Sequence, residues 1–186
     1  PRPPTIIWSD AMWESSEGMG GFVIYVPEYA GKPEEVYLSE HVPGRETIDC
    51  FVDGKKTYIG QLELIYAVAP YMSKPGLLAG RRVLHFIDNT SAIAGLVSGY
   101  SAAVDSGKIV NAFHAYNVGL QSEPYFEYVR SEANVADLPS RGRIEEMIDA
   151  LRRGGVKAKP KRIECILPDL QSYRELSLIH ISEPTR

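Results

Sequence analysis

Four acidic residues constrain this chain most, because two of them, Glu63 and Asp88, stand in or directly after segments that the sequence predicts to be buried, and Asp10 and Asp137 stand in comparable settings. The apolar run Val83–Ile87 is typical of an interior strand, and it ends on Asp88. Asp10 closes a short apolar strand, Glu63 lies in a helical stretch that is apolar nearly all round, and Asp137 follows in the segment NVADLPSR. A carboxylate buried without a partner costs several kcal/mol, so the fold must supply partners for these groups.

The order of the predicted elements indicates an α/β fold. Three short strands, joined by tight turns, are expected over 5–10, 18–26 and 34–42, and the ambiguous segment 43–58 carries a turn signal, Asp53-Gly54, that favours an extra hairpin. The rest alternates between helix (59–72, 91–100, 109–120 and 134–153) and strand (81–88 and 125–130). Pro70 and Pro75 bound the end of the first helix, and Pro139 breaks the last one. The order β-β-β-α-β-α-α-β-α predicts a mixed five-stranded sheet, an antiparallel meander followed by alternating α and β, with helices on its faces.

This element order can bring the four carboxylates together. Strand one, the first helix and the fourth strand can be neighbours at the sheet centre, and the last helix can close over them. Carboxylates within about 4–8 Å of one another would repel and shift one another's pKa values, and a divalent cation relieves that repulsion. Hard oxygen ligands select Mg²⁺ or Mn²⁺, and two such ions about 4 Å apart activate water in phosphodiester hydrolysis.

Each acid also has a purely structural interpretation, which the residues alone leave open. Glu63 could pair with Arg81 or Arg82, and Asp88 could cap the helix that follows it. Asp10 could begin a turn. Asp137 would be favoured by the helix dipole in a first helical turn.

The segments around these acids match a known family. They are SDA (9–11) followed by GMGG (18–21), then QLEL (61–64), FIDNTSA (86–92) and NVADLPSR (134–141). On these residues the chain, from about Thr5 to about Arg153, resembles the ribonuclease H domain attached to reverse transcriptases of LTR- and DIRS-like retroelements. The resemblance implies a ribonuclease H-like fold and hydrolysis of the RNA strand of RNA/DNA hybrids.

The resemblance also implies roles for the acids. Asp10, Glu63, Asp88 and Asp137 would bind two Mg²⁺ ions, with Mn²⁺ as an alternative metal. Asp10 would bridge both ions, Glu63 and Asp88 would hold the ion near the leaving group, and Asp137 would help hold the ion that carries the attacking water. Cellular members of the family carry a His just before the last acid, and this chain has none between Tyr125 and Asp137.

Basic residues gather near the C-terminal end although the net charge is −4. Residues 141–162 hold eight Lys and Arg against three acids, which could track a phosphate backbone or form a solvated helix face and tail. Arg141 and Arg143 are the expected nucleic-acid contacts there. Asn89 and Asn134 could contact a 2′-OH or a base edge, and Asn89 could equally be only a helix cap.

Other polar and glycine positions are expected to serve the fold. His41, His85 and His114 are interpreted as structural. The GMGG segment is expected to form a turn, which either lets backbone approach the substrate or only satisfies the turn itself.

One catalytic domain is expected over 5–153, followed by a basic linker and C-terminal extension over 154–175. The last residues, 176–186, resemble the translation of a sequencing adapter. The chain begins without Met, as a fragment of a polyprotein would, and the resemblance implies an upstream reverse transcriptase polymerase domain.

No apolar run reaches the roughly 18 residues that a bilayer requires, and the two cysteines lack disulfide or metal spacing. An intracellular protein of the cytoplasm or nucleus, without a membrane partner, is expected.

Two other functions fit the same residues. A nuclease of this fold could act on DNA, as resolvases and transposases do. A non-catalytic module, like the connection domains of reverse transcriptases, could only bind the hybrid. Four acids argue against that module, because a purely structural role has no use for their repulsion.

Overall fold

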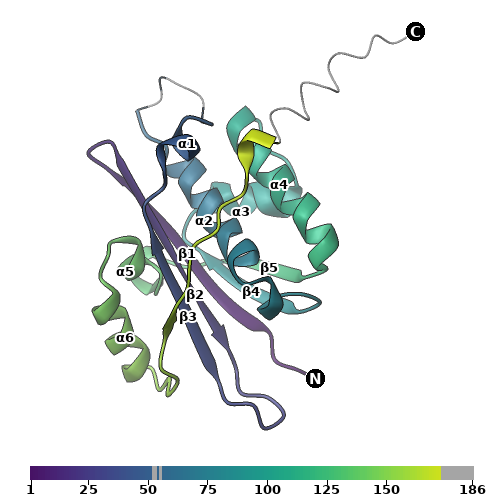
Figure 1. Cartoon of the computed structure of the whole chain (residues 1–186), viewed down its shortest axis with the longest axis vertical. Helices are drawn as coiled ribbons and strands as arrows, with labels where there is room; N and C mark the ends of the chain where they lie inside the picture. Colours follow the sequence, from purple (N-terminus) through teal and green to yellow (C-terminus); the bar gives the residue numbers. More distant parts are fainter. Residues whose placement is uncertain (52–53, 55, 173–186) are drawn as a thin grey trace.

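A mixed six-stranded sheet runs through the molecule in the order β5-β4-β1-β2-β3-β6 (Figure 1). The computed structural model describes residues 1–51, 54 and 56–172. The strands are β1 (Thr5–Glu14), β2 (Glu17–Val26), β3 (Glu35–His41), β4 (Arg82–Ile87), β5 (Glu123–Tyr128) and β6 (Lys161–Arg162). β1, β2 and β3 form an antiparallel meander, and β4 and β5 run parallel to β1. The expected fold class is confirmed, with β6 as a sixth strand that the sequence did not predict.

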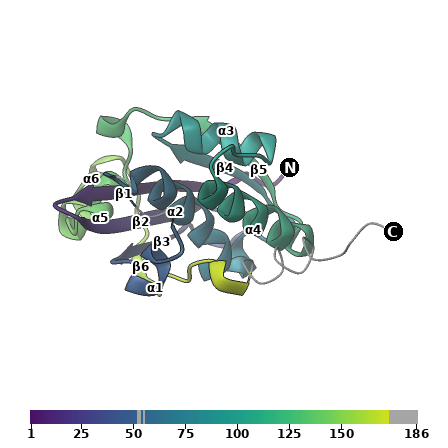
Figure 2. The ribbon, with the colours of Figure 1, turned by 90° about the horizontal axis from the view of Figure 1, so that it is seen from above.

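The helices cover both faces of this sheet (Figures 1 and 2). They are α1 (Arg45–Ile48), α2 (Ile59–Ser73), α3 (Thr90–Ser98), α4 (Val104–Leu120), α5 (Asp137–Ser140) and α6 (Ile144–Arg153), with 3-10 turns η1 (Pro75–Leu77) and η2 (Ser131–Ala133). The larger core joins one face to α2, α3 and α4, for example through Phe22 and Tyr66. A smaller core joins the other face to α6 through Val23, Leu38 and Met147.

The GMGG segment lies inside β2, which confirms the strand expected over 18–26, and the turn that was also considered for these glycines is not formed. Ser15 and Ser16, both at positive φ, make the two-residue turn that joins β1 to β2. A Cβ on Gly20 would lie 2.0 Å from the Tyr66 ring, so this glycine lets α2 pack closely on the sheet.

The segment between β3 and α2 also differs from the expectation. The extra hairpin within 43–58 is wrong for the described residues, because 45–48 form the short helix α1. Asp53 of the expected turn lies outside the described residues. Pro70 does not end the first helix: α2 continues through it to Ser73, because burial on nearly all sides holds the helix together despite the missing N–H.

The last helix is broken, as expected, but the break lies at 141–143 and not at Pro139, which is inside α5. α5 starts at Asp137 rather than 134, and Gly142, at φ 72°, turns the chain into α6. The two pack at different places: α5 lies against β1, β2 and β3 near Asp10, and α6 fills the smaller core. The break therefore allows α5 to pack near the acids while α6 packs in the smaller core.

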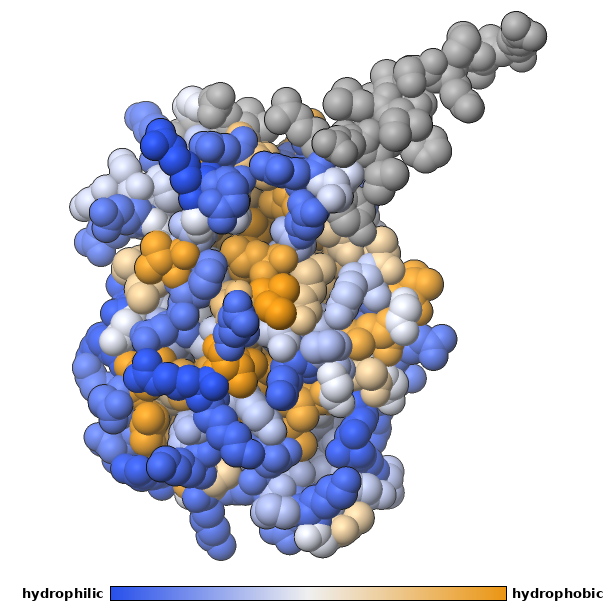
Figure 3. Space-filling model, viewed as in Figure 1, coloured by the Kyte–Doolittle hydropathy of each residue, from blue (hydrophilic) through white to orange (hydrophobic). Residues whose placement is uncertain are grey.

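The segment after α6 runs along the sheet edge from β6 toward α1 (Figure 1). β6 pairs with β3, and Leu170 is buried in the larger core. On this side of the molecule hydrophilic side chains cover most of the surface, and apolar side chains emerge in smaller patches (Figure 3). No helix among the described residues is long and apolar enough to cross a bilayer. The expected adapter-like tail, 176–186, lies outside the described residues.

Candidate active site

Three of the four predicted acids meet at one end of the central strands. β1 and β4 are parallel neighbours, and their paired register ends at Trp8 beside Phe86, two residues before Asp10 and Asp88 respectively. Glu63 lies in the second turn of α2, which packs across β1. One carboxylate oxygen from each of Asp10, Glu63 and Asp88 lies within 4.8 Å of the other two. The predicted convergence is confirmed for these three residues.

Asp10 and Glu63 are both buried, and their partners are few. Asp10 Oδ2 accepts a hydrogen bond from Ser140 Oγ at 2.5 Å. Glu63 Oε1 accepts from the Ala11 backbone N–H at 3.3 Å. Glu63 Oε2 is buried with no hydrogen-bond partner among the described residues. Since Glu63 Oε2 makes no hydrogen bond that would stabilise the fold, it is available to bind a ligand.

Asp88 is half-buried and follows the last residue of β4. Its Oδ2 accepts from Ser131 Oγ at 2.7 Å. It does not cap α3, because Asn89 has that position. Sequence reasoning assigned no role to Ser131 or Ser140. Ser140 lies within the segment NVADLPSR, so the sequence could have pointed to it. Ser131 reaches Asp88 only through the loop after β5, and no local sequence pattern predicts that contact.

The cluster is electrostatically costly without a cation. Burial, and then the charges of Asp88 and Asp137, raise the pKa of Asp10 to about 7, although the Ser140 hydrogen bond opposes the shift. Burial, followed by the charges of Asp10 and Asp88, raises the pKa of Glu63 well above its ordinary value. No ion pair in the described part of the chain involves Glu63, so the alternative of a partner arginine is not supported.

Asp137 lies beside this cluster and not in it. It occupies the first turn of α5, and its Oδ1 accepts from Arg141 Nε at 2.8 Å. Its charge still contributes to the raised pKa of Asp10, which places the two carboxylates within electrostatic reach. The structure thus gives Asp137 a cationic partner of its own.

The two asparagines have internal partners. Asn89 Oδ1 accepts from the Ala92 N–H at 2.9 Å and so caps α3. Asn134 is buried: it donates to the Ser9 carbonyl at 3.0 Å and accepts from the Ala136 N–H at 3.1 Å. Asn134 thus ties the start of α5 to β1 beside Asp10, and its contact with nucleic acid stays a prediction.

Acidic side chains engage much of the basic stretch 141–162. Arg141 pairs with Asp137, and Arg143 pairs with Glu146 through two hydrogen bonds. Three further pairs are Arg152 with Asp149, Lys161 with Glu35 and Arg162 with Glu40. Five of its eight cations thus have acidic partners within the molecule.

The three histidines within the described residues are held by internal hydrogen bonds, as expected of structural residues. His85 is fully buried between Ser9 Oγ and Tyr71 Oη, and burial lowers its pKa to about 3, so it is neutral. His114 Nε2 lies 2.9 Å from the Leu96 carbonyl.

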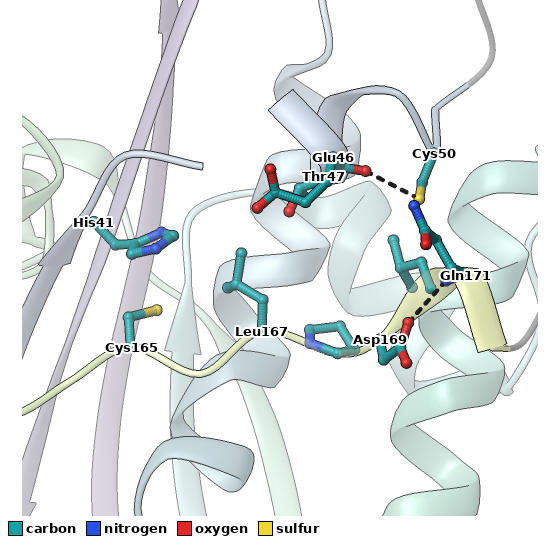
Figure 4. Close-up of a pocket in the computed structure, with 10 residues that line it drawn as sticks. His41, Glu46, Thr47, Cys50, Cys165, Leu167, Asp169 and Gln171 are labelled. Atoms are coloured by element: carbon teal, nitrogen blue, oxygen red, sulfur yellow. Dashed lines mark hydrogen bonds between the residues drawn. The ribbon is translucent and has the colours of Figure 1, made fainter. Parts of the chain in front are cut away.

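His41 lines a pocket of about 340 Å³ that none of the clustered acids enters. Its Nδ1 lies 2.9 Å from Tyr66 Oη. Figure 4 shows His41 and Cys165 on one side of this pocket, with side chains from α1 and from the C-terminal segment around the rest. The pocket is thus separate from the acidic cluster.

The acidic cluster fits a hard divalent cation. Its donors are three carboxylates, the donor type that Mg²⁺ and Mn²⁺ prefer. Glu63 Oε2 is buried without a partner among the described residues, and the pKa values of Asp10 and Glu63 are raised. A cation bound by these carboxylates would relieve both effects. Asp10, Glu63 and Asp88 can therefore hold a metal ion.

Comparison with known proteins identifies the fold. No family model matches the sequence, and no curated protein matches it significantly. Among solved structures, the N-terminal ribonuclease H domain of Rv2228c from Mycobacterium tuberculosis aligns with a TM-score of 0.57 at 13% identity, over 78% of this chain and 96% of that one. Ribonuclease H1 from Halobacterium salinarum aligns with a TM-score of 0.55 at 12% identity, over 76% and 98%. The chain has a ribonuclease H-like fold, with a buried acidic triad consistent with a nuclease active site.

Proposed function

We propose that this chain is a metal-dependent endonuclease that hydrolyses the RNA strand of RNA/DNA hybrids. The observation that carries the proposal is the convergence of Asp10, Glu63 and Asp88 within 4.8 Å of one another on a ribonuclease H-like fold. The two similar structures named above are a ribonuclease H domain and a ribonuclease H1, which supports the same substrate class for this chain.

Asp10, Glu63 and Asp88 would hold the metal, with Asp137 as the proposed fourth acid. Mg²⁺ ions bound there would supply activation of water and stabilisation of the leaving oxygen in phosphodiester hydrolysis. The protein's own contribution is positioning. The Ala11 N–H fixes one oxygen of Glu63 and leaves the other available, and Ser140 fixes the Asp10 carboxylate.

We further propose that the domain belongs to a retroelement reverse transcriptase and acts beside its polymerase domain on the hybrid. The segments SDA, GMGG, QLEL, FIDNTSA and NVADLPSR support this assignment. A nuclease that acts on DNA would share the fold and the acids, so substrate choice separates the two.

Gel-resolved cleavage tests the proposal. Labelled hybrid, duplex DNA and duplex RNA would be incubated with the full chain and Mg²⁺, beside Asp88→Asn and the control Asp149→Asn, which neutralises an exposed acid on α6. We expect cleavage of the RNA in the hybrid alone, retained by the control and lost in Asp88→Asn by about 10²-fold or more.

Cleavage of duplex DNA would instead assign the chain to the DNA-directed side of the superfamily. Binding of the hybrid without cleavage of any substrate would contradict the catalytic proposal and favour a connection-type module.

A further inference from the structure

The ion pair between Asp137 and Arg141 stands at the exposed rim of the acidic cluster. Arg141 directly follows Ser140, whose hydroxyl contacts Asp10 Oδ2. Its Nη1 lies 4.0 Å from the sulfur of Met12, two residues beyond Asp10 on β1. The guanidinium therefore lies over β1, beside the first acid of the cluster.

Most of the donors of Arg141 are available. An arginine has five N–H donors, and Asp137 takes the one on Nε while the Met12 sulfur is a weak acceptor for Nη1. The Arg141 side chain is 47% exposed, against 27% for Asp137. Its open fork of donors matches the geometry of a phosphate group.

Negative charges in and near the cluster also act on Arg141. Its pKa is raised first by the hydrogen bond to Asp137 and by that residue's charge, and Asp10 and Glu14 add to the shift. Arg143, two residues on, is instead bound through two hydrogen bonds to Glu146. Arg141 is thus the cation that both neighbours the cluster and retains donors for a ligand.

We propose that the Asp137–Arg141 ion pair is a latch, which couples binding of a nucleic-acid backbone phosphate to completion of the acid cluster. In the free protein Arg141 neutralises Asp137 and holds its carboxylate outside the three-acid group. A phosphate that takes the guanidinium releases Asp137 toward Asp10. The inference rests on the proposed function for the source of that phosphate, the backbone of the hybrid.

The latch predicts opposite effects of Arg141→Ala on two ligands. Mn²⁺ should bind the free protein about three- to tenfold more tightly, because a competing cation is gone and Asp137 is released. The hybrid should bind more weakly, and the slope of log K against log[salt] should fall in magnitude by about 0.7–0.9, the value of one phosphate contact. A folding defect would weaken both ligands together.

Mn²⁺ binding would be measured by electron paramagnetic resonance without nucleic acid, and hybrid binding by fluorescence anisotropy in EDTA at several salt concentrations. Arg82→Ala is the matched control: it removes the same side chain at the start of β4, where its partner is the Arg2 carbonyl. Asp137→Asn should weaken Mn²⁺ binding measured with hybrid present. Melting temperatures confirm that each variant is folded.

The latch is overturned if Arg141→Ala weakens Mn²⁺ binding, or if it matches Arg82→Ala in Mn²⁺ affinity and salt slope. If the wild-type chain also cuts the hybrid, the proposed function stands and only the latch fails. If the wild-type chain binds no Mn²⁺, the metal-dependent function fails and the latch fails with it.

Discussion

Glu63 shows what the acidic cluster costs the metal-free protein. One oxygen accepts from the Ala11 N–H, and the other is buried without a partner among the described residues. A buried acceptor left unsatisfied is destabilising by about 1–3 kcal/mol, and the charges of Asp10 and Asp88 add repulsion. A group so unfavourable for the fold is a candidate for ligand binding, since perturbed carboxyl groups concentrate at functional sites.

Glu63→Gln should therefore stabilise the protein in EDTA. The amide carries no charge for Asp10 and Asp88 to repel, and it can donate to a neighbouring carboxylate, so we expect the free energy of unfolding to rise by about 1 kcal/mol. The same change should abolish the stabilisation that Mg²⁺ gives. Urea unfolding with EDTA and with Mg²⁺ measures both effects. A variant less stable in EDTA that still responds to Mg²⁺ would show that Glu63 serves the fold and not the metal.

Asp10 predicts a pH dependence of stability. Its pKa is raised from 3.8 to about 7 on folding. Between these values the folded protein keeps a proton that the unfolded chain has lost, so the free energy of unfolding falls as pH rises through the window. Without metal we expect a loss of about 2–4 kcal/mol between about pH 4 and pH 8, most of it absent in Asp10→Asn. Urea unfolding in EDTA across this range measures it, and a wild-type profile that rises with pH would contradict the prediction.

Among the elements, β2 depends on its glycines for the approach of α2. A Cβ on Gly20 would lie 2.0 Å from the ring of Tyr66, which is fully buried. We expect Gly20→Ala to cost about 1–3 kcal/mol, the usual range for overpacking, measured by urea unfolding. Gly60→Ala, within α2, meets nothing within 4 Å and should be neutral or stabilising by up to about 1 kcal/mol. Equal effects of the two substitutions would show that the sheet and α2 adjust freely.

The sequence predicted the elements whose signals are local. The apolar runs that end on Asp10 and Asp88, and the apolar helix around Glu63, follow from residue periodicity, and their order placed the three acids together. β6 was missed because two residues carry no period, and it exists only through pairing with β3. One partner of the acids was missed for a similar reason, because Ser131 reaches Asp88 through loop geometry that no spacing encodes. Asp137 and Arg141 differ, since their four-residue spacing is that of a helical ion pair and could have predicted the contact.

At the scale of the whole molecule, the C-terminal segment covers the β3 edge of the sheet. The Ile163 N–H donates to the Leu38 carbonyl, and the Ile166 N–H donates to Ser73 Oγ on α2. Lys161 and Arg162 pair with Glu35 and Glu40 of β3. Because these two cations already have acidic partners on β3, fewer cations of the basic stretch 141–162 are available to contact a phosphate backbone. Open sheet edges invite pairing with other chains, and this cover closes one of them.

Packing of the C-terminal segment should also contribute to global stability. Leu170 is 5% exposed and belongs to the larger core, whereas Ile166 is 47% exposed. If residues after 160 fold with the domain, Leu170→Ala should lower the free energy of unfolding by about 2–4 kcal/mol within a single cooperative transition. Ile166→Ala keeps the backbone bonds to Ser73 and should cost less than about 1 kcal/mol. Urea unfolding followed by circular dichroism and by tryptophan fluorescence provides the measurement. An early, separate transition, or a similar small loss of unfolding free energy in both variants, would show that the segment unfolds independently of the domain. The reason is that truncation of a buried leucine destabilises the whole molecule only when its segment unfolds together with the rest.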